Sequence, residues 1–155
     1  MDGTTLEALP LRIYTIGYTR KTARDFFEEL LSIDARYLVD IRVHNSSHLA
    51  SFTKKGHIEF FLQNLTDLVY VEQPLLAPSE EMFKRYRSDG NWTYYESRYA
   101  QLMRDRRVAE EIDQSLFRDG AVLLCGEPTP ERCHRRLAAE FLRDELFPSA
   151  QIVHI

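Results

Sequence analysis

The 155-residue chain contains only two cysteines, Cys125 and Cys133, and both lie in one stretch that reads LLCGEPTPERCH. Two cysteines are too few for a fold that depends on a framework of disulfides. No apolar run approaches the roughly 20 residues that a membrane-spanning helix needs, so we expect no association with membranes. Positive charge is not in excess either, because the formal net charge is −4, and this disfavours non-specific binding to nucleic acid.

The opening segment, MDGTTLEALP, is acidic and polar, and no basic segment leads from it into an apolar run. This pattern predicts that no signal peptide is present and that the protein is cytoplasmic, where thiols stay reduced. Hydrophobic residues make up 44% and charged residues 28% of the chain, as in ordinary globular proteins. The length suits one compact domain, so we expect residues 1–155 to form a single domain.

Segments typical of buried strands alternate with segments of helical periodicity. The predicted strands are residues 11–17, 37–43, 68–74, 121–126 and 151–155. Such alternation gives a mostly parallel sheet with helices on both faces. The sequence therefore predicts an α/β fold, a three-layer sandwich around a mostly parallel five-stranded sheet that is Rossmann-like, with 11–17 and 121–126 adjacent at its centre. A helical, aromatic-rich insertion is expected at about 74–117.

Three polar stretches each follow a predicted strand: GYTRK, DIRVHN and CGEPTPERCHR. Ligands in open α/β sheets bind outside the carboxyl ends of the strands, where the strand order reverses. We therefore expect one crevice to gather all three stretches. Neither G-x-G-x-x-G nor G-x-x-x-x-G-K-[ST] occurs, so the dinucleotide fingerprint is lacking and no particular cofactor is indicated.

Cys133 directly precedes a predicted helix, where free backbone amides and the helix dipole lower the pKa of a thiol. His134 and Arg135 would lower it further, which makes Cys133 a candidate nucleophile or redox centre, with His134 or Asp40 transferring protons. The alternative is that Cys133 only packs. Cys125 ends the predicted central strand and is either a core residue or a second catalytic thiol; since the spacing is not a paired C-x-x-C, we predict no metal site.

Charged residues in the same stretches are candidates for binding an anionic group. Arg135 and the amides of its helix would clamp a phosphate or carboxylate, with Glu127 in the same substrate site; the alternative is an ion pair with Asp40 or Glu127. Arg42 is a second candidate anion contact, and Asp40 a general base or an acceptor for a ribose hydroxyl. Asp40 and Arg42 could also simply pair with each other.

The first loop of the expected crevice contains Gly17, Tyr18 and Thr19. Gly17 would let the backbone approach a ligand closely, Tyr18 could stack on a base, and Thr19 could form a hydrogen bond to the ligand. The aromatic helix at 92–103 is either core or a lid that provides a stacking wall for the crevice.

Residues 14–19 (YTIGYT), 39–42 (VDIR) and 123–135 (LLCGEPTPERCHR), with the final VHI, resemble the family known as domain of unknown function 488. The last motif is long and specific, and the similarity covers nearly the whole chain. Tyr18 stands where His is common in the family. The resemblance implies an α/β fold and a family suspected of containing enzymes, but it supplies no reaction.

The leading hypothesis is a small cytosolic enzyme with a thiol-containing, anion-binding crevice. Its substrate would carry a phosphate, as a nucleotide or a nucleic acid does. Two alternatives stay open: a non-catalytic module that binds a nucleotide or a nucleic-acid end, and a redox or metal sensor that uses both thiols. The sequence gives neither the reaction nor the oligomeric state.

Overall fold

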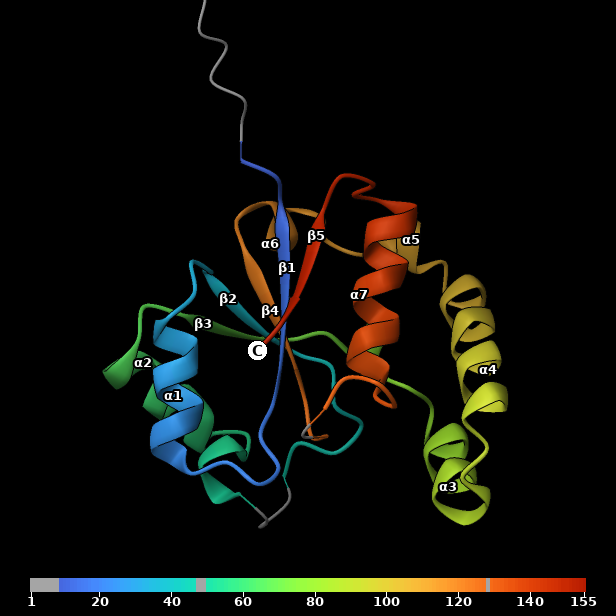
Figure 1. Ribbon diagram of the computed structural model, residues 1–155, viewed down its shortest axis with the longest axis horizontal. Coiled ribbons are helices and arrows are strands. Elements are labelled where there is room, and N and C mark those ends of the chain that lie inside the picture. Colours follow the sequence, from blue (N-terminus) through green and yellow to red (C-terminus); the bar gives the residue numbers. More distant parts are fainter. Residues whose placement is uncertain (1–8, 47–49, 128) are drawn as a thin grey trace, which may run out of the picture.

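The computed structural model describes residues 9–46, 50–127 and 129–155. Its centre is a five-stranded sheet in the order β3-β2-β4-β1-β5, in which every neighbouring pair is parallel (Figure 1). The strands are β1 (Arg12–Gly17), β2 (Tyr37–Asp40), β3 (Val69–Glu72), β4 (Ala121–Cys125) and β5 (Gln151–His154). The predicted α/β architecture is confirmed, with β1 and β4 side by side and β4 at the centre of the sheet.

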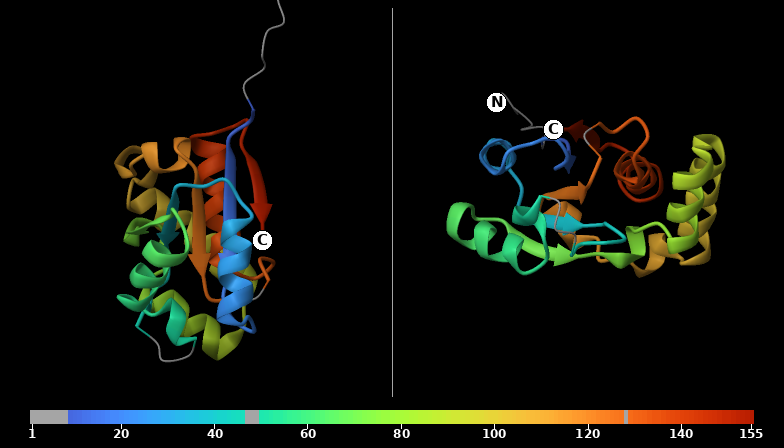
Figure 2. Two further views of the ribbon diagram at one scale, coloured as in Figure 1. Left: turned by 90° about the vertical axis from the view of Figure 1, so that its left-hand side faces the viewer. Right: turned by 90° about the horizontal axis from the view of Figure 1, so that it is seen from below.

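Helices cover both faces of this sheet (Figure 2). They are α1 (Ala23–Leu31), α2 (His57–Leu65), α3 (Glu80–Asp89), α4 (Trp92–Asp105), α5 (Val108–Glu111), α6 (Ser115–Arg118) and α7 (His134–Glu145). Short 3-10 helices span Ser51–Thr53 and Pro74–Leu76. The helices α1 and α2 pack on one face, and α4 to α7 pack on the other. Between β3 and β4 the chain is helical, and α3 packs against α4.

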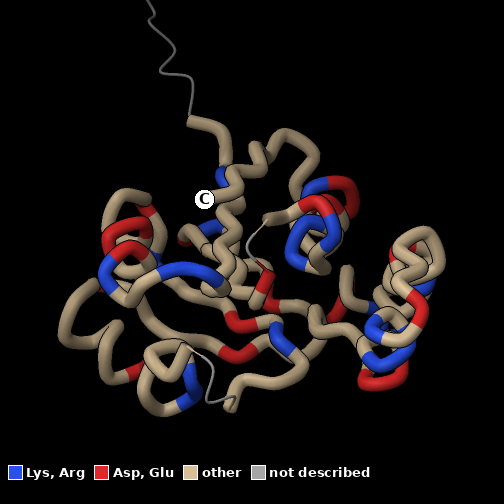
Figure 3. The backbone as a smooth tube through the Cα atoms, turned by 60° about the horizontal axis from the view of Figure 1, so that its bottom comes forward, with Lys and Arg blue, Asp and Glu red and all other residues tan. Residues whose placement is uncertain are grey.

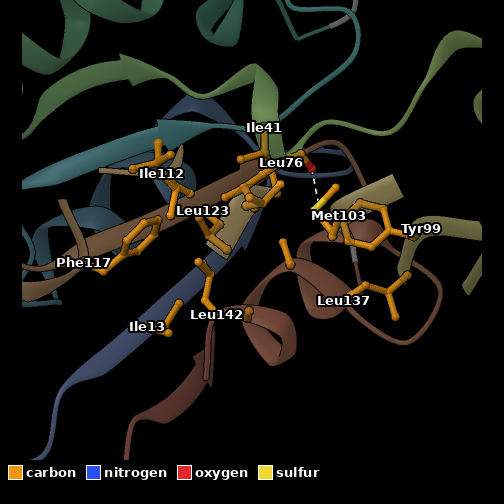
Figure 4. Packing of buried hydrophobic residues seen from close by; sticks show 14 of the residues in the cluster. Ile13, Ile41, Leu76, Tyr99, Met103, Ile112, Phe117, Leu123, Leu137 and Leu142 are labelled. Carbon is orange, nitrogen blue, oxygen red and sulfur yellow. Dashed lines mark hydrogen bonds between the residues drawn. The ribbon is translucent and has the colours of Figure 1, made fainter. Parts of the chain in front are cut away.

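The strands build two separate apolar layers because successive side chains of a strand point to opposite faces. In β4, Val122 and Leu124 pack with α1 and α2, whereas Leu123 packs with α7 on the other face. Figure 4 shows the second layer, in which Leu123 and Ile13 of the sheet lie close to Leu142 of α7. The same alternation decides which polar side chains can meet at the strand ends.

Helix starts follow the capping residues in the sequence. Ser79 precedes α3, and its side chain accepts a hydrogen bond from the backbone N–H of Met82 at 3.2 Å. Thr22 does the same for α1, accepting from Asp25 at 3.1 Å. Cys133 occupies the equivalent position of α7, so its sulfur lies at the start of that helix.

In Figure 3, Lys and Arg positions and Asp and Glu positions both occur along the helices. Within the described residues, none of the helices combines the length and the apolar character that crossing a lipid bilayer requires.

Candidate functional site

A cleft of about 740 Å³ opens at the carboxyl ends of the central strands. All three polar stretches contribute to its walls, together with α3 and α4. The lining residues are Tyr18, Thr19, Arg42, Val43, His44, Ser46, Phe83, Tyr86, Arg87, Trp92, Tyr95, Cys125, Gly126, Glu127, Arg132, Cys133 and His134. The expected crevice therefore exists and contains both thiols.

The two thiols touch each other at the base of the cleft. Cys125 ends β4 and Cys133 begins α7, and their Sγ atoms are 2.8 Å apart, with Cys133 as the donor. Both are free cysteines, with exposed fractions of 4% and 2%. The sulfurs are thus within reach of a ligand only through the cleft.

His134 is held in one orientation against Cys125. Its Nε2–H donates to the carbonyl oxygen of Ile41 at 2.7 Å, and a carbonyl can only accept. The other ring nitrogen, Nδ1, therefore faces the sulfur of Cys125 at 3.4 Å. A nucleophile, a nitrogen base and a third group that orients the base are the components of an activated-nucleophile site.

The two thiols have opposite tendencies to ionise. Burial raises the pKa of Cys125, but the hydrogen bond from Cys133 and the positive charge of His134 outweigh it and lower this pKa well below that of a free thiol. Burial and the neighbouring Cys125 raise the pKa of Cys133. Burial lowers the pKa of His134, yet the Cys125 thiolate more than offsets this and the net shift is upward. The site therefore favours a thiolate on Cys125 paired with an imidazolium on His134.

This corrects the expectation that Cys133 is the low-pKa thiol. Cys133 does cap α7, and its sulfur accepts the backbone N–H of Arg135 at 3.5 Å. The helix terminus would lower the pKa of Cys133, but two effects outweigh it. Cys133 donates a hydrogen bond to Cys125, and ionising Cys133 would place a second negative charge beside the first, which is unfavourable.

Asp40 does not reach the cleft, so its expected role as a general base or ribose acceptor is corrected. In the sheet Asp40 lies beside Leu124, and its side chain faces α1 and α2, away from Cys125. Its Oδ1 accepts the Nε–H of Arg42 at 2.9 Å, and its Oδ2 accepts an Nη2–H at 2.8 Å and the hydroxyl of Tyr70. The buried ion pair with Arg42, which the sequence left open, is the arrangement found.

Arg42 connects this ion pair to the cleft. Burial lowers its pKa, but its hydrogen bonds and charge interaction with Asp40 give a net rise, so the guanidinium stays charged. Its Nη2 also donates to the carbonyl oxygen of Thr53 at 2.7 Å, and its guanidinium lies 5.4 Å from the centroid of the Tyr18 ring. A fixed cation and an aromatic ring therefore share one wall.

Arg135 lies beneath the cleft and not in it, which corrects its expected role as an anion clamp. Its exposed fraction is 0%, and its Nη1 donates to the backbone carbonyl of Glu127. Its Nε and Nη2 have no hydrogen-bond partner among the described residues. The guanidinium thus fastens the loop between β4 and α7 from below.

Gly17 and Thr19 also serve this loop. A Cβ atom on Gly17 would overlap the carbonyl of Glu127 and the guanidinium of Arg135, so glycine is needed for the approach of the protein's own loop and not of a ligand. Thr19 donates to the carbonyl oxygen of Gly126 from its backbone N–H at 3.0 Å and from its hydroxyl at 2.5 Å. Both contacts set the position of the strand end that carries Cys125.

Glu127 and Tyr18 remain in the cleft as expected. Glu127 is the one carboxylate among the described lining residues. Burial and the nearby Cys125 raise its pKa. A carboxyl group with a raised pKa beside a thiolate is suited to donate a proton.

The opposite wall is aromatic and comes from α3 and α4. The rings of Trp92 and Tyr95 stack with centroids 5.0 Å apart and planes 16° apart, and the ring of Tyr86 packs against both. Tyr99, one turn further along α4, is buried and donates to the carbonyl of Leu76 at 2.7 Å (Figure 4). The sequence left open whether the aromatic helix is core or a wall of the crevice. The start of α4 lines the cleft, and the residues further along α4 belong to the core.

Two exposed arginines that sequence reasoning did not single out also line the cleft, Arg87 of α3 and Arg132 of the loop before α7. The spacing of Phe83, Tyr86 and Arg87 places these side chains on one face of a helix and could have indicated the first. Arg132 belongs to the polar stretch before Cys133 but has no distinguishing pattern of its own.

Cys125, Cys133 and His134 are also a group that could hold a metal ion, because one donor atom from each lies within 4.8 Å of the others. Three donors are one fewer than a structural zinc site contains. Each donor atom here already has a protein partner, so this grouping alone assigns no metal.

The sequence model of the family described as domain of unknown function DUF488 matches residues 22–142, which include the second and third motifs. No curated protein and no solved structure matches the chain.

The buried ion pair gives a test of the corrected role of Asp40. Replacing Asp40 by Ala leaves Arg42 and Tyr70 without their acceptor, and we expect a loss of about 3–5 kcal/mol in the free energy of unfolding. The exposed Asp34→Ala is the matched control and should change it by less than about 0.5 kcal/mol. Urea denaturation measures both, and equal effects would contradict the structural role.

Proposed function

Because the chain belongs to the DUF488 family, whose description names no activity, we propose from the cleft that it is a cysteine-dependent enzyme acting on a substrate with an aromatic ring and a phosphate. Nucleotides and nucleic acids have both groups. The observation that carries this proposal is the contact of Cys125 with Nδ1 of His134, whose Nε2–H is held by the carbonyl of Ile41. We place the enzyme in the cytoplasm, where its thiols stay reduced.

Cys125 is the nucleophile in this proposal. Its thiolate attacks an electrophilic atom of the substrate and forms a covalent bond through sulfur, while the bond to the leaving group breaks. Glu127 donates a proton to the leaving group, which its raised pKa favours. His134 remains protonated and stabilises the thiolate until it attacks.

The walls of the cleft support the substrate class. The partly exposed ring of Trp92, with the buried ring of Tyr95 stacked on it, offers an aromatic surface, and stacking of a base on an aromatic side chain contributes roughly 1–3 kcal/mol. Arg87 and Arg132 line the same cleft and supply positive charge for an anionic group, whereas Arg42 lines it with its charge paired to Asp40. This local charge exists although the chain as a whole has a net charge of −4.

A non-catalytic binding module is the second candidate. The low exposed fractions of the two cysteines favour it, because buried thiols are usually inert. In this alternative the arginines and aromatic rings bind the same class of ligand, and the cysteines only pack.

Alkylation of the native protein separates the two candidates. With a reductant and a chelator present, we expect iodoacetamide to modify Cys125 at a pH well below the value of about 8.5 for a free thiol. Since the pKa of Cys125 is lowered, the rate should fall only as the pH drops through that lowered value. Mass spectrometry of the labelled peptides identifies the residue.

Variants show whether His134 causes the effect. His134→Gln removes the positive charge and should move the alkylation profile of Cys125 to higher pH, whereas the exposed His57→Gln should leave it unchanged. Labelling of both cysteines only after unfolding would favour the binding module and reject the enzyme.

Ligand binding can be followed through the single tryptophan, because Trp92 lines the cleft. We expect nucleoside 5′-monophosphates to quench its fluorescence and to bind more tightly than the nucleosides. Arg132→Gln should weaken binding of the monophosphates by about tenfold. The control is Arg118→Gln, since Arg118 is exposed on α6 outside the cleft. Equal affinity for nucleosides and monophosphates would contradict the proposed phosphate contact.

A further inference from the structure

The proposed reaction uses Cys125 and leaves Cys133 without a chemical role, although its sulfur is the nearest neighbour of the nucleophile. We propose that Cys125 and Cys133 form an oxidative modification site, in which a small hydroperoxide converts them into an intramolecular disulfide that reversibly blocks the cleft nucleophile. The blocking effect rests on the proposed function, whereas formation of the disulfide does not.

The geometry of the pair suits this reaction. The two Sγ atoms are 2.8 Å apart, and a disulfide requires about 2.05 Å, so the sulfurs need to approach by less than 1 Å. Cys133 is the N-cap residue directly before α7, and Cys125 lies at the end of the central strand.

The chemistry divides between the two sulfurs. The Cys125 thiolate attacks one oxygen of the hydroperoxide, and the O–O bond breaks. The leaving alkoxide or hydroxide takes the proton of the His134 imidazolium, so that the products are a sulfenic acid on Cys125, an alcohol or water, and a neutral His134. Cys133 then attacks the sulfenic sulfur, forms the S–S bond and releases water. The peroxide is reduced by two electrons and the two thiols are oxidised by two. A thiol reductant reverses the modification by exchange.

Access to the pair also fits a small oxidant. Both sulfurs line the cleft of about 740 Å³ but are almost fully covered, so a large disulfide-bonded partner has little room to reach them. Tyr95 of α4 and Glu127 line the same cleft as the two sulfurs, and Nδ1 of His134 lies 3.4 Å from the sulfur of Cys125. A hydroperoxide is among the smallest oxidants that could enter this cleft.

The test uses the full chain, reduced and then freed of reductant with a chelator present. Equimolar hydrogen peroxide should remove both alkylatable thiols, and a non-reducing peptide map should show the peptides of Cys125 and Cys133 joined within one chain. Dithiothreitol should restore both thiols. In Cys133→Ser the reaction should stop at the sulfenic acid, which dimedone traps on Cys125, while Cys125→Ser should form no adduct on the remaining thiol.

The outcomes separate this inference from the proposed function. No joined peptide, a dimedone adduct on the wild type equal to that on Cys133→Ser, or joining between two chains overturns the inference. So does a tightly bound metal ion that prevents oxidation until it is removed. If the disulfide forms but Cys125 alkylates with the pH dependence of a free thiol, the modification site stands and the proposed enzyme fails. If Cys125 alkylates at low pH but no disulfide forms, the proposed enzyme stands and the modification site fails.

Discussion

The hydrogen bond from Nε2 of His134 to the carbonyl oxygen of Ile41 is the contact on which the site depends. It joins the start of α7 to the segment after β2, across 93 positions of sequence, and it leaves Nδ1 free to face Cys125. Without it the imidazole could turn, and Cys125 would be a buried thiol with no positive charge beside it. The second sulfur adds a hydrogen bond to the same thiolate, so the ionised form is stabilised from two directions.

Around this contact, the side chains that line the cleft are distinct from the side chains that fix the positions of the surrounding strands and loops. Strand alternation sends Asp40 to the face of α1 and α2, where it keeps Arg42 charged and in place. Arg135 and Gly17 act below the loop that follows β4, one by a hydrogen bond and the other by leaving space. The described residues that line the cleft include a thiol with a lowered pKa, one carboxyl group, aromatic rings and arginines.

Much of this could be predicted from the sequence, because strand ends and helix starts are local features. The polar stretches after three predicted strands indicated one crevice, and the position of Cys133 before a helix was readable from its flanking residues. Which cysteine ionises could not be predicted, since that depends on distances between Cys125, Cys133 and His134 that only the fold sets. The expected role of Asp40 is wrong because pairing of β2 with β4, together with the two-residue period of strands, separates it from Cys125, and the fold alone shows this pairing. No pattern in the sequence predicted the burial of Arg135 either.

The central claim is that Cys125 and His134 form an ion pair at neutral pH, and the protonation state of the His134 ring tests it directly. Nitrogen NMR of histidine-labelled protein distinguishes an imidazolium, with protons on both ring nitrogens, from a neutral ring that carries one. The account predicts a doubly protonated His134 in the wild type and a neutral ring in Cys125→Ser. A neutral His134 in the wild type, with its proton on Nε2 alone, would contradict it.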